Sequence, residues 1–384
     1  MTNAENAARK YFPDFVRLLR SDAMLSKKYL EISVLCLVGG FSPAKADNAA
    51  ESAPTRISTA SAHALDSMAP HGHWAARLTL LHNGYDQRYD NRKDRVDLDA
   101  ETNRALTAFG ASLDTRVTTE FAELLLGYGV TENLTLGAIV PYASTRSRVT
   151  LTEAAPGTMA AVLGGLGYAQ PLATRVTSGW SDPTLGALWR FRQSARASAV
   201  LGFGVRVGLA KADDPDDPVD IPPGDGSTDL RFRLEYFRDL GKGWDLRLLG
   251  EHQAQLPDAV VARPGGPFSP TKEKLKRNLG DYQEFDVELG KTWGDWRASG
   301  TWHRYQEAPD RYTSWIGTDT RALSSDTRTL ADQYRVGITW SGVRAWRAGK
   351  LFMPLIVKLE MQDAFRGRNF VDVRDIYLRV TGLF

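Results

Sequence analysis

ASAVLGFGVRVGLAK, residues 197–211, alternates between an apolar face and a face of serine, glycine and arginine. Leu201 and Phe203 belong to the first face, and Gly204 and Arg206 belong to the second. A repeat of two residues is the spacing of a β-strand whose two faces meet different surroundings. The stretch therefore predicts a strand with one apolar side and one polar side.

The same alternation recurs along most of the chain from Trp74 onward. Soluble β-sandwiches also alternate, so the pattern by itself does not distinguish water outside the sheet from lipid outside it. We expect twelve strands, near residues 73–89, 115–130, 134–151, 182–193, 197–211, 228–239, 244–257, 283–292, 295–307, 331–342, 350–364 and 371–384.

The connections between these strands alternate in length. Short turns such as 131–133 and 293–295 alternate with long loops such as 152–181 and 258–282. An even number of antiparallel strands with short turns at one rim and long loops at the other is typical of bacterial outer-membrane barrels. Because lipid offers no hydrogen bonds to unpaired strand edges, a spanning sheet must close. The pattern predicts an all-β fold, a transmembrane antiparallel β-barrel of about 12 strands with short periplasmic turns and long extracellular loops.

Composition narrows the function class. The chain has 384 residues, with 48 Lys plus Arg against 46 Asp plus Glu and a formal charge of +2. This near-neutral balance argues against a nucleic-acid binder, which needs a basic domain or stripe. Apolar runs are too short for membrane-spanning helices, which need about 18 or more apolar residues. Only strands are then left to cross a membrane.

The N-terminal region reads as an export signal. Lys27 and Lys28 precede the apolar run 32–38, and Ala44-Lys45-Ala46 forms an A-x-A site, as in secretory signal peptides. We expect residues 1–46 to be an N-terminal extension and signal peptide, cleaved after Ala46, with translation starting at Met1 or Met24. Residues 47–72 then form a flexible periplasmic lead-in, and residues 73–384 form the barrel.

The polar faces of the predicted strands carry charges of both signs. They would form either a charged path through the lumen or cross-strand pairs that brace the wall, each pair worth roughly 0.2–1 kcal/mol. A barrel of about 12 strands lies between filled small barrels and open large ones, so both interpretations stay open. The lumen-lining candidates are Arg206, Arg231, Arg233, Glu235, Asp245, Arg247, Glu251, Glu284, Asp286, Glu288, Arg297, Arg335, Lys358, Glu360 and Arg379.

The loop 152–181 is unusually apolar for an extracellular loop. Its centre could form a short helix, and burial of apolar surface is favoured by about 25 cal/mol per Å². The loop is predicted either to fold inward and constrict the mouth, where it would contact an organic solute, or to pack on the rim or on lipopolysaccharide. The gate candidates are Met159, Val162, Leu163, Leu166 and Tyr168.

The chain ends on the apolar face of its last strand. Phe384 lies on the same face of the strand as Leu378 and Val380, because even numbers of residues separate them. A terminal Phe on such a strand resembles the assembly signal of outer-membrane barrels. We therefore expect Phe384 to be recognised by the barrel assembly machinery. Outer-membrane lipid and lipopolysaccharide are the expected partners of the outer surface.

Three stretches resemble one family of outer-membrane proteins. They are LGYGVTENLTLGAIVPY at 126–142, GWSDPTLGALWRF at 179–191 and GDGSTDLRFRL at 224–234. They are similar to the hairpin and strand openings of the family named for the meta pathway of phenol degradation. The resemblance covers roughly residues 74–260, with Trp180-Ser181 standing where the family commonly has glycine before the aspartate. It implies a channel or transporter associated with small, often aromatic, organic compounds, and it brings no catalytic residues.

No cofactor, metal or catalytic motif accompanies the strands. Gly164-Gly165-Leu166-Gly167 lacks the lysine and the strand context of a phosphate loop. The predicted function is passive passage of a small organic solute through an outer-membrane channel without an enzymatic activity. The alternatives are a non-conducting structural barrel and a lipid-acting outer-membrane enzyme, which would need an activated serine beside a histidine.

Overall fold

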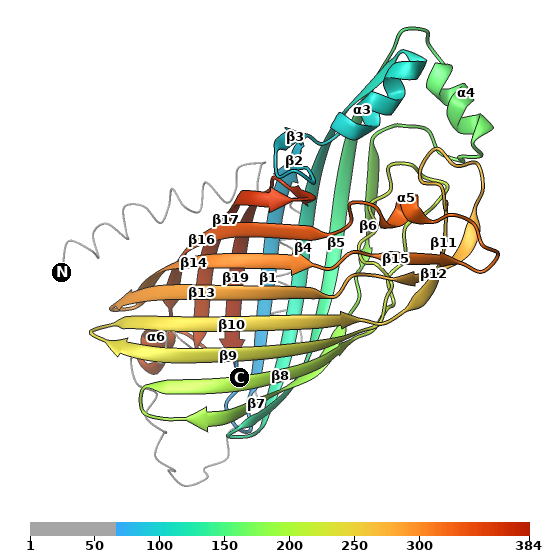
Figure 1. Cartoon of the computed structure of the whole chain (residues 1–384). Helices are drawn as coiled ribbons and strands as arrows, with labels where there is room; N and C mark the ends of the chain where they lie inside the picture. The colour runs from blue at the N-terminus through green and yellow to red at the C-terminus, as the bar shows by residue number, and fades with distance from the viewer. Residues whose placement is uncertain (1–66) are drawn as a thin grey trace. The chain divides into compact units, whose positions relative to one another are not determined.

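The computed structural model describes residues 67–384 and shows a closed antiparallel β-barrel (Figure 1). The signal peptide expected at 1–46 and most of the expected lead-in lie outside the described residues. Among the described helices, none is long and apolar enough to cross a membrane. The barrel wall accounts for most of the described chain, and smaller elements decorate the loop rim.

Twelve strand positions make the wall, and the strands follow each other in chain order around it. The prediction of an antiparallel 12-strand barrel is confirmed. The wall strands are β1 (Trp74–Tyr85), β4 (Ala111–Thr131), β5 (Leu134–Glu153), β7 (Thr184–Gln193), β8 (Ala197–Arg206), β9 (Asp229–Gly241), β10 (Trp244–Gln255), β13 (Tyr282–Trp293), β14 (Trp296–Glu307), β16 (Thr329–Ser341), β17 (Leu355–Arg368) and β19 (Arg374–Leu383).

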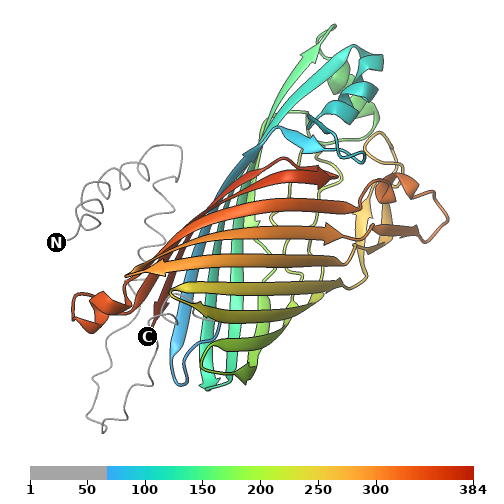
Figure 2. The ribbon, with the colours of Figure 1, turned by 60° about the vertical axis from the view of Figure 1, so that its left-hand side comes forward.

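The barrel closes where its first and last wall strands pair. β1 pairs with β19 from Ala75↔Leu383 to Gly84↔Arg374, and β1 pairs with β4 on its other side. At the turn rim, the Trp74 amide donates to the Phe384 carbonyl at 2.8 Å, and the Phe384 amide donates to the Trp74 carbonyl at 3.0 Å. Figure 2 shows these first and last strands running side by side. Closure leaves no free wall edge along the lipid, as a membrane sheet requires.

The fourth wall position differs from the predicted single strand at 182–193. It is divided into β6 (Arg175–Trp180) and β7, which pair with successive parts of β5. Pro183 lies at the break and has no amide proton to donate to a ladder. The Ser181 amide still donates to the Pro141 carbonyl at 2.9 Å, which holds the break against β5.

The loops contain short elements that alternation along the wall does not reveal. Two small sheets lie at the loop rim, and the β4–β5 hairpin rises beyond the neighbouring strands to carry helices α3 and α4 (Figures 1 and 2). The loop elements are β2 (Gln87–Tyr89), β3 (Arg95–Asp97), α3 (Ala100–Leu106), η1 (Thr107–Phe109), α4 (Thr158–Gly165), β11 (Asp258–Ala262), β12 (Glu273–Asn278), β15 (Arg311–Ser314), α5 (Arg321–Ser324) and β18 (Phe370–Val371), and α6 (Val343–Arg347) lies in the longest connection at the turn rim.

Burial is inverted relative to a water-soluble protein. Leu136, Leu185 and Trp189 are 50%, 59% and 53% exposed on the outer face, whereas Glu235 and Glu360 are 2% and 1% exposed on the inner face. An apolar exterior and a polar interior are the pattern of transmembrane β-barrels. The wall therefore faces lipid, and the fold is that of a bacterial outer-membrane protein.

Aromatic side chains gather near the ends of the strands. At the turn rim, the rings of Trp74 and Tyr128 lie 5.1 Å apart, and Trp296 is paired with both Trp293 and Trp340 across the ladder. Such rings sit at the level of the lipid headgroups in outer-membrane barrels. Their position defines the turn-side border of the lipid-facing band.

Candidate functional site

The strand register brings the predicted polar faces together in one lumen. Arg206 lies opposite Asp229, Arg231 opposite Gln253, and Glu251 opposite Glu284. Side chains that oppose each other in a ladder share one face of the sheet. All fifteen lumen-lining candidates occupy inward positions by this register, and their part in solute contact stays a prediction.

Ion pairs link most of these side chains into a network. Arg297 donates to Asp245 at 2.5 Å and to Glu288 at 2.7 Å. Lys358 then lies 3.2 Å from Glu288 and 2.7 Å from Glu360. The network thus passes through β10, β14, β13 and β17. Because removing one partner would leave a buried charge unpaired, each link favours one arrangement of the lumen wall.

Further pairs flank this network. The guanidinium groups of Arg231, Arg247 and Arg379 donate to Glu251, Glu235 and Glu360, respectively. Closer to the loop rim, His303 and Asp286 are 2.5 Å apart, and Arg335 lies 3.4 Å from the same carboxylate. The bracing interpretation of the charged ladder therefore describes a large part of the lumen.

The wall formed by β4, β5, β7 and β8 is different, because a row of glycines crosses it. Gly127, Gly137, Gly186 and Gly204 are successive partners in the ladders of these four strands. A Cβ atom at Gly186 would lie 2.6 Å from the Phe203 carbonyl oxygen and 3.1 Å from the Gly204 Cα. The strands approach too closely for a side chain here, so the row leaves this part of the lumen wall bare.

Apolar side chains border the glycine row on the inside of the barrel. Leu125 and Ile139 oppose each other on β4 and β5, and Leu188 lies on β7 beside Gly202 of β8. A Cβ atom at Gly202 would lie 2.9 Å from Leu188 Cδ2 and 3.1 Å from Arg233 Cβ, so both side chains pack over this glycine. Beside the glycine row, the lumen wall is therefore mainly apolar, whereas the facing wall of β9, β10, β13, β14 and β17 is charged.

A cavity of about 300 Å³ lies between these two kinds of wall. This volume is at the lower end of the range for small-molecule sites. The apolar wall contributes Leu125, Ile139, Leu188 and the glycines. Its charged lining consists of Arg77, Arg231, Arg233, Arg247, Arg297, Lys358, Arg379, Glu235, Asp245, Glu251 and Glu288.

The end of the predicted flexible lead-in is buried against this cavity. Met68 and Ala69 are 5% and 2% exposed. The Ser67 hydroxyl donates to Glu235 at 2.7 Å, and the Ala69 amide donates to the Thr135 hydroxyl at 3.0 Å. These contacts with β9 and β5 place residues 67–69 inside the barrel, against its inner face. No periodicity in this segment indicated that position.

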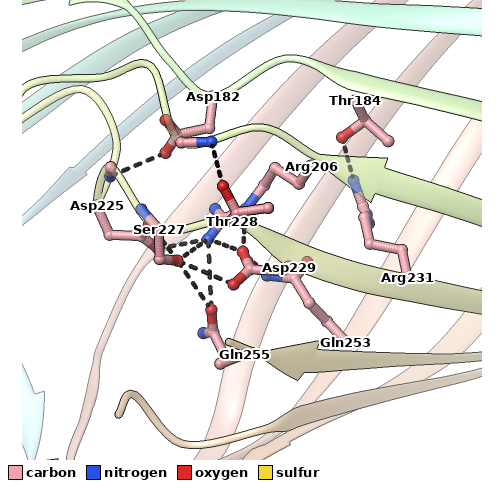
Figure 3. Close-up of polar contacts among 12 residues, drawn as sticks. Asp182, Thr184, Arg206, Asp225, Ser227, Thr228, Asp229, Arg231, Gln253 and Gln255 are labelled. Carbon is pink, nitrogen blue, oxygen red and sulfur yellow. Dashed lines mark hydrogen bonds and ion pairs between the residues drawn. The ribbon is translucent and has the colours of Figure 1, made fainter. Parts of the chain in front are cut away.

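At the loop rim, two of the stretches that resemble the phenol meta-pathway family come together in one polar cluster (Figure 3). Asp182, from the stretch 179–191, accepts from the amides of Leu209 and Ala210, each at 2.8 Å. It also accepts from the Gly226 amide at 3.1 Å. One buried carboxylate therefore holds both ends of the loop 207–228 against the break between β6 and β7.

The stretch 224–234 completes the cluster around Arg206. This guanidinium donates to Asp225 at 2.6 Å and to Asp229 at 2.5 Å, and the Ser227 hydroxyl donates to Asp225 at 2.8 Å. Burial alone would raise the pKa of the Asp225 carboxyl, but Arg206 and the bonds from Ser227 hold it below its usual range. The charged form of Asp225 is thus built into the loop.

The five gate candidates lie in the loop that contains α4. Met159, Val162 and Leu163 are helix residues, and Met159 packs with Leu106 and Ala111 in a small apolar cluster outside the barrel wall. None of the described residues that line the cavity comes from this loop. These positions match the rim-packing alternative, and a role in limiting passage stays a prediction.

The other end of this loop is tied to neighbouring loops. The Tyr168 hydroxyl donates to the Pro267 carbonyl at 2.7 Å, and the Arg263 guanidinium lies 3.8 Å from the centre of the Tyr168 ring. Arg263 also donates to the carbonyl of Leu166 at 2.7 Å. Leu166 and Tyr168 thus join the loop to the chain between β10 and β13.

Several lumen residues were missing from the sequence prediction. Arg77 on β1 faces Glu123 on β4 at 3.5 Å, although the alternation of 73–89 placed Arg77 on a strand. The available signal was the spacing of Arg77, Thr79 and Asn83, which are separated by even numbers of residues and therefore share one face of the strand. The alternation places Gly204 on the polar face of its strand, but it does not show that Gly204 continues a row with Gly127, Gly137 and Gly186, because the row depends on the register of three ladders.

Among solved structures, the chain is similar to the crystal structure of the COG4313 outer membrane channel from Pseudomonas putida F1. The sequence identity is 14% and the TM-score 0.56, over 82% of this chain and 96% of that chain. Similarity at this identity shows a shared fold. It supports the outer-membrane assignment made above from the inverted burial.

Weaker similarities occur with a FadL homologue from Pseudomonas aeruginosa, at 12% identity and a TM-score of 0.37 over 81% of this chain and 90% of that chain. They occur also with a TodX mutant monoaromatic hydrocarbon channel, at 10% identity and 0.35 over 82% and 91%. No family model and no curated protein matches the chain, so the resemblance to the phenol meta-pathway family stays a prediction. The protein has the fold of an outer-membrane β-barrel channel.

Proposed function

We propose that this protein is a passive outer-membrane channel for small organic compounds. The observation that carries the proposal is the cavity of about 300 Å³ inside the closed barrel, bounded by charged side chains on one side and by glycines and apolar side chains on the other. A small organic compound with a polar end and an apolar body would find both kinds of surface at this point of the lumen.

The expected solutes are small and often aromatic. The resemblance of residues 74–260 to the phenol meta-pathway family supports this class, as does the small cavity volume of about 300 Å³. Bulky solutes would have to displace residues 67–69 and break links of the ion-pair network. Passage driven only by a concentration gradient requires no cofactor or nucleotide.

The proposal is tested with the purified full chain in planar bilayers and in liposomes. We expect discrete single-channel currents, and swelling of liposomes in phenol that is faster than in a sugar at the same osmolarity. Liposomes without protein correct for phenol that crosses the lipid itself. Absence of both currents and protein-dependent swelling would overturn the channel proposal.

A non-conducting structural barrel is the second candidate. Two observations favour it. One is the ion-pair network from Asp245 to Glu360, and the other is the segment 67–69 that lies inside the barrel against its inner face. In that function the paired charges would only brace the barrel. If the protein is a structural barrel, we expect no single-channel currents in bilayers even though the protein is folded and inserted.

The contacts of His82 and His303 do not favour a lipid-acting enzyme. His82 lies 2.7 Å from Glu120, and His303 lies 2.5 Å from Asp286. An activated serine nucleophile needs its hydroxyl hydrogen-bonded to the histidine, and the side-chain bonds of these two histidines within residues 67–384 go to carboxylates. We therefore propose a transport function without catalysis.

A further inference from the structure

Two arginines in the lumen cavity have hydrogen-bonding capacity that the protein does not use. Arg77 approaches its nearest carboxylate, Glu123, only to 3.5 Å, and Arg233 approaches Glu251 and Glu235 only to 3.6 and 3.7 Å. The Nε atoms of both arginines are buried without a hydrogen-bond partner among the described residues. The terminal nitrogens of both arginines therefore make only long contacts with carboxylates, and a ligand with suitable acceptors would supply the shorter hydrogen bonds that the protein does not make.

The other cations of the cavity are engaged, which distinguishes these two. Arg297 has two carboxylate partners at 2.5 and 2.7 Å, and Lys358 has one at 2.7 Å. The side chains of Arg77 and Arg233 are 33% and 29% exposed, and both line the cavity. They are therefore available to a bound solute.

The charges around these arginines favour an anion. Seven of the described side chains that line the cavity are cationic and four are acidic. The cationic side chains of the lining therefore outnumber the acidic ones by three. Like charges that gather in a low-dielectric cleft attract a counter-ion of opposite sign. A guanidinium group also matches the two oxygens of a carboxylate better than an ammonium group does.

The surface next to both arginines is apolar rather than polar. Arg77 is followed across the ladder by Leu125 and then by Ile139. Arg233 packs over Gly202 beside Leu188. The glycine row lies between these two groups and leaves room for a ring or a short chain. The two arginines would therefore hold the charged end of a solute, and this wall its apolar body.

We propose that the cavity is a binding site for a small organic carboxylate, with Arg77 and Arg233 holding the carboxylate and Leu125, Ile139 and Leu188 holding the apolar body. This inference rests on the proposed channel function and names the solute class that the channel selects. Neutral aromatic compounds lack the charge that these arginines would neutralise, so they should bind the same cavity less well.

The test is a calorimetric titration of the folded full-length protein in detergent with benzoate, benzamide and inorganic phosphate. We expect saturable binding of benzoate, and binding of benzamide and phosphate that is about tenfold weaker or more, because each lacks either the charge or the apolar body. Equal binding of benzoate and phosphate would overturn the apolar part of the site. Equal binding of benzoate and benzamide would overturn the carboxylate part.

The variants Arg77→Gln and Arg233→Gln should each weaken benzoate binding about tenfold. The variant Arg233→Lys keeps the charge and should lose less. Arg374→Gln is the matched control, because Arg374 pairs with Asp363 on the outer face. Gel mobility before and after heating verifies that each variant is folded.

Benzoate binding that is unchanged in Arg77→Gln and in Arg233→Gln would overturn the site, whatever the conductance. The channel proposal stands or falls separately, on currents and liposome swelling in the absence of benzoate. A silent bilayer together with arginine-dependent benzoate binding would overturn the channel and leave the carboxylate site in place.

Discussion

At the scale of single residues, the glycine row shows how closely the strands on one side of the wall approach each other. Gly137 and Gly186 have neighbouring backbone atoms within 3 Å of the position where a Cβ atom would lie. Side chains at these positions would push adjacent strands apart. Gly250 and Gly300, on the outer face, have no such neighbour within 4 Å. Glycine is therefore required on the inside of this wall and replaceable on the outside.

The variant Gly186→Val tests this requirement. Its Cβ would begin 2.6 Å from the Phe203 carbonyl oxygen, and overpacking of this kind costs about 1–3 kcal/mol. We expect a lower unfolding temperature, measured by the shift in gel mobility on heating. Gly300→Ala is the control and should unfold like the parent protein. Equal stability of both variants would mean that the strands can separate at little cost.

A second residue-scale prediction concerns pH and Asp225. Its pKa is held below the ordinary value of 3.8 by Arg206 and Ser227, so its charged form contributes stability that is present above that value. Asp225→Asn should lower the free energy of unfolding by about 1 kcal/mol at neutral pH. Because protonation removes the ion pair in the parent protein, the difference should shrink as the pH falls below 3.8.

Urea unfolding of the parent protein and of Asp225→Asn, from pH 7 to pH 3, measures this difference directly. Carboxylates that titrate equally in both proteins contribute equally to the two free energies of unfolding, so their contributions cancel in the difference. A difference that stays constant down to pH 3 would contradict the role of the Arg206 pair.

At the scale of elements, the segment 67–69 connects the N-terminal part of the chain to the lumen. It contacts β9 through Glu235 and β5 through Thr135. Three hydrogen bonds join the segment to these two strands, and the Met68 side chain adds apolar contact with the cavity. These interactions are weak enough for the segment to be replaced without loss of the barrel.

Replacement of residues 67–69 by three glycines should increase the single-channel conductance, because it removes the Met68 side chain and the Ser67 bond from the lumen. Bilayer recordings before and after the change provide the measurement. Glycines in place of Arg92 and Lys93, which are exposed at the loop rim, serve as the control. Unchanged conductance would show that this segment does not limit passage.

The loop with α4 allows a contrasting test. Its apolar residues pack with α3 and β4 outside the lumen, so we expect deletion of residues 156–168 to leave the conductance unchanged and to make the β4–β5 extension more sensitive to protease. Bilayer recordings and limited proteolysis check the two parts. A higher conductance after the deletion would support the inward gate instead.

At the scale of the whole molecule, closure depends on the seam between β1 and β19. Phe384 exchanges two backbone hydrogen bonds with Trp74 at the turn rim. Its ring is 43% exposed, on the same outward phase as Ile376, Leu378 and Val380. A terminal aromatic residue at this place would be accessible to an assembly factor before the seam closes.

Deletion of Phe384 should therefore reduce the fraction of folded, heat-modifiable protein in the outer membrane. Both the seam bonds and the terminal ring are lost. Phe384→Tyr keeps both and is expected to assemble normally. Full assembly after the deletion would remove the proposed role of this residue.

The alternation of residue types by itself determined the fold class. Strands that separate lipid from a polar lumen must alternate, since neighbouring side chains point to opposite faces. Turn lengths then set the order of strands around the wall, because short antiparallel connections join neighbours. For the same reason, the inward position of residues such as Arg231 and Glu288 could be read from sequence.

Only the tertiary structure decided which inward residues meet and which stay unsatisfied. The glycine row depends on the exact register of three neighbouring ladders. The cluster of Asp182 with Gly226 and the burial of Met68 join residues that are distant in sequence, so the folded barrel creates them. Arg77 and Arg297 look alike in sequence, yet Arg297 has two close carboxylates and Arg77 has one at 3.5 Å. The difference is set by distances across the lumen, which no local pattern encodes.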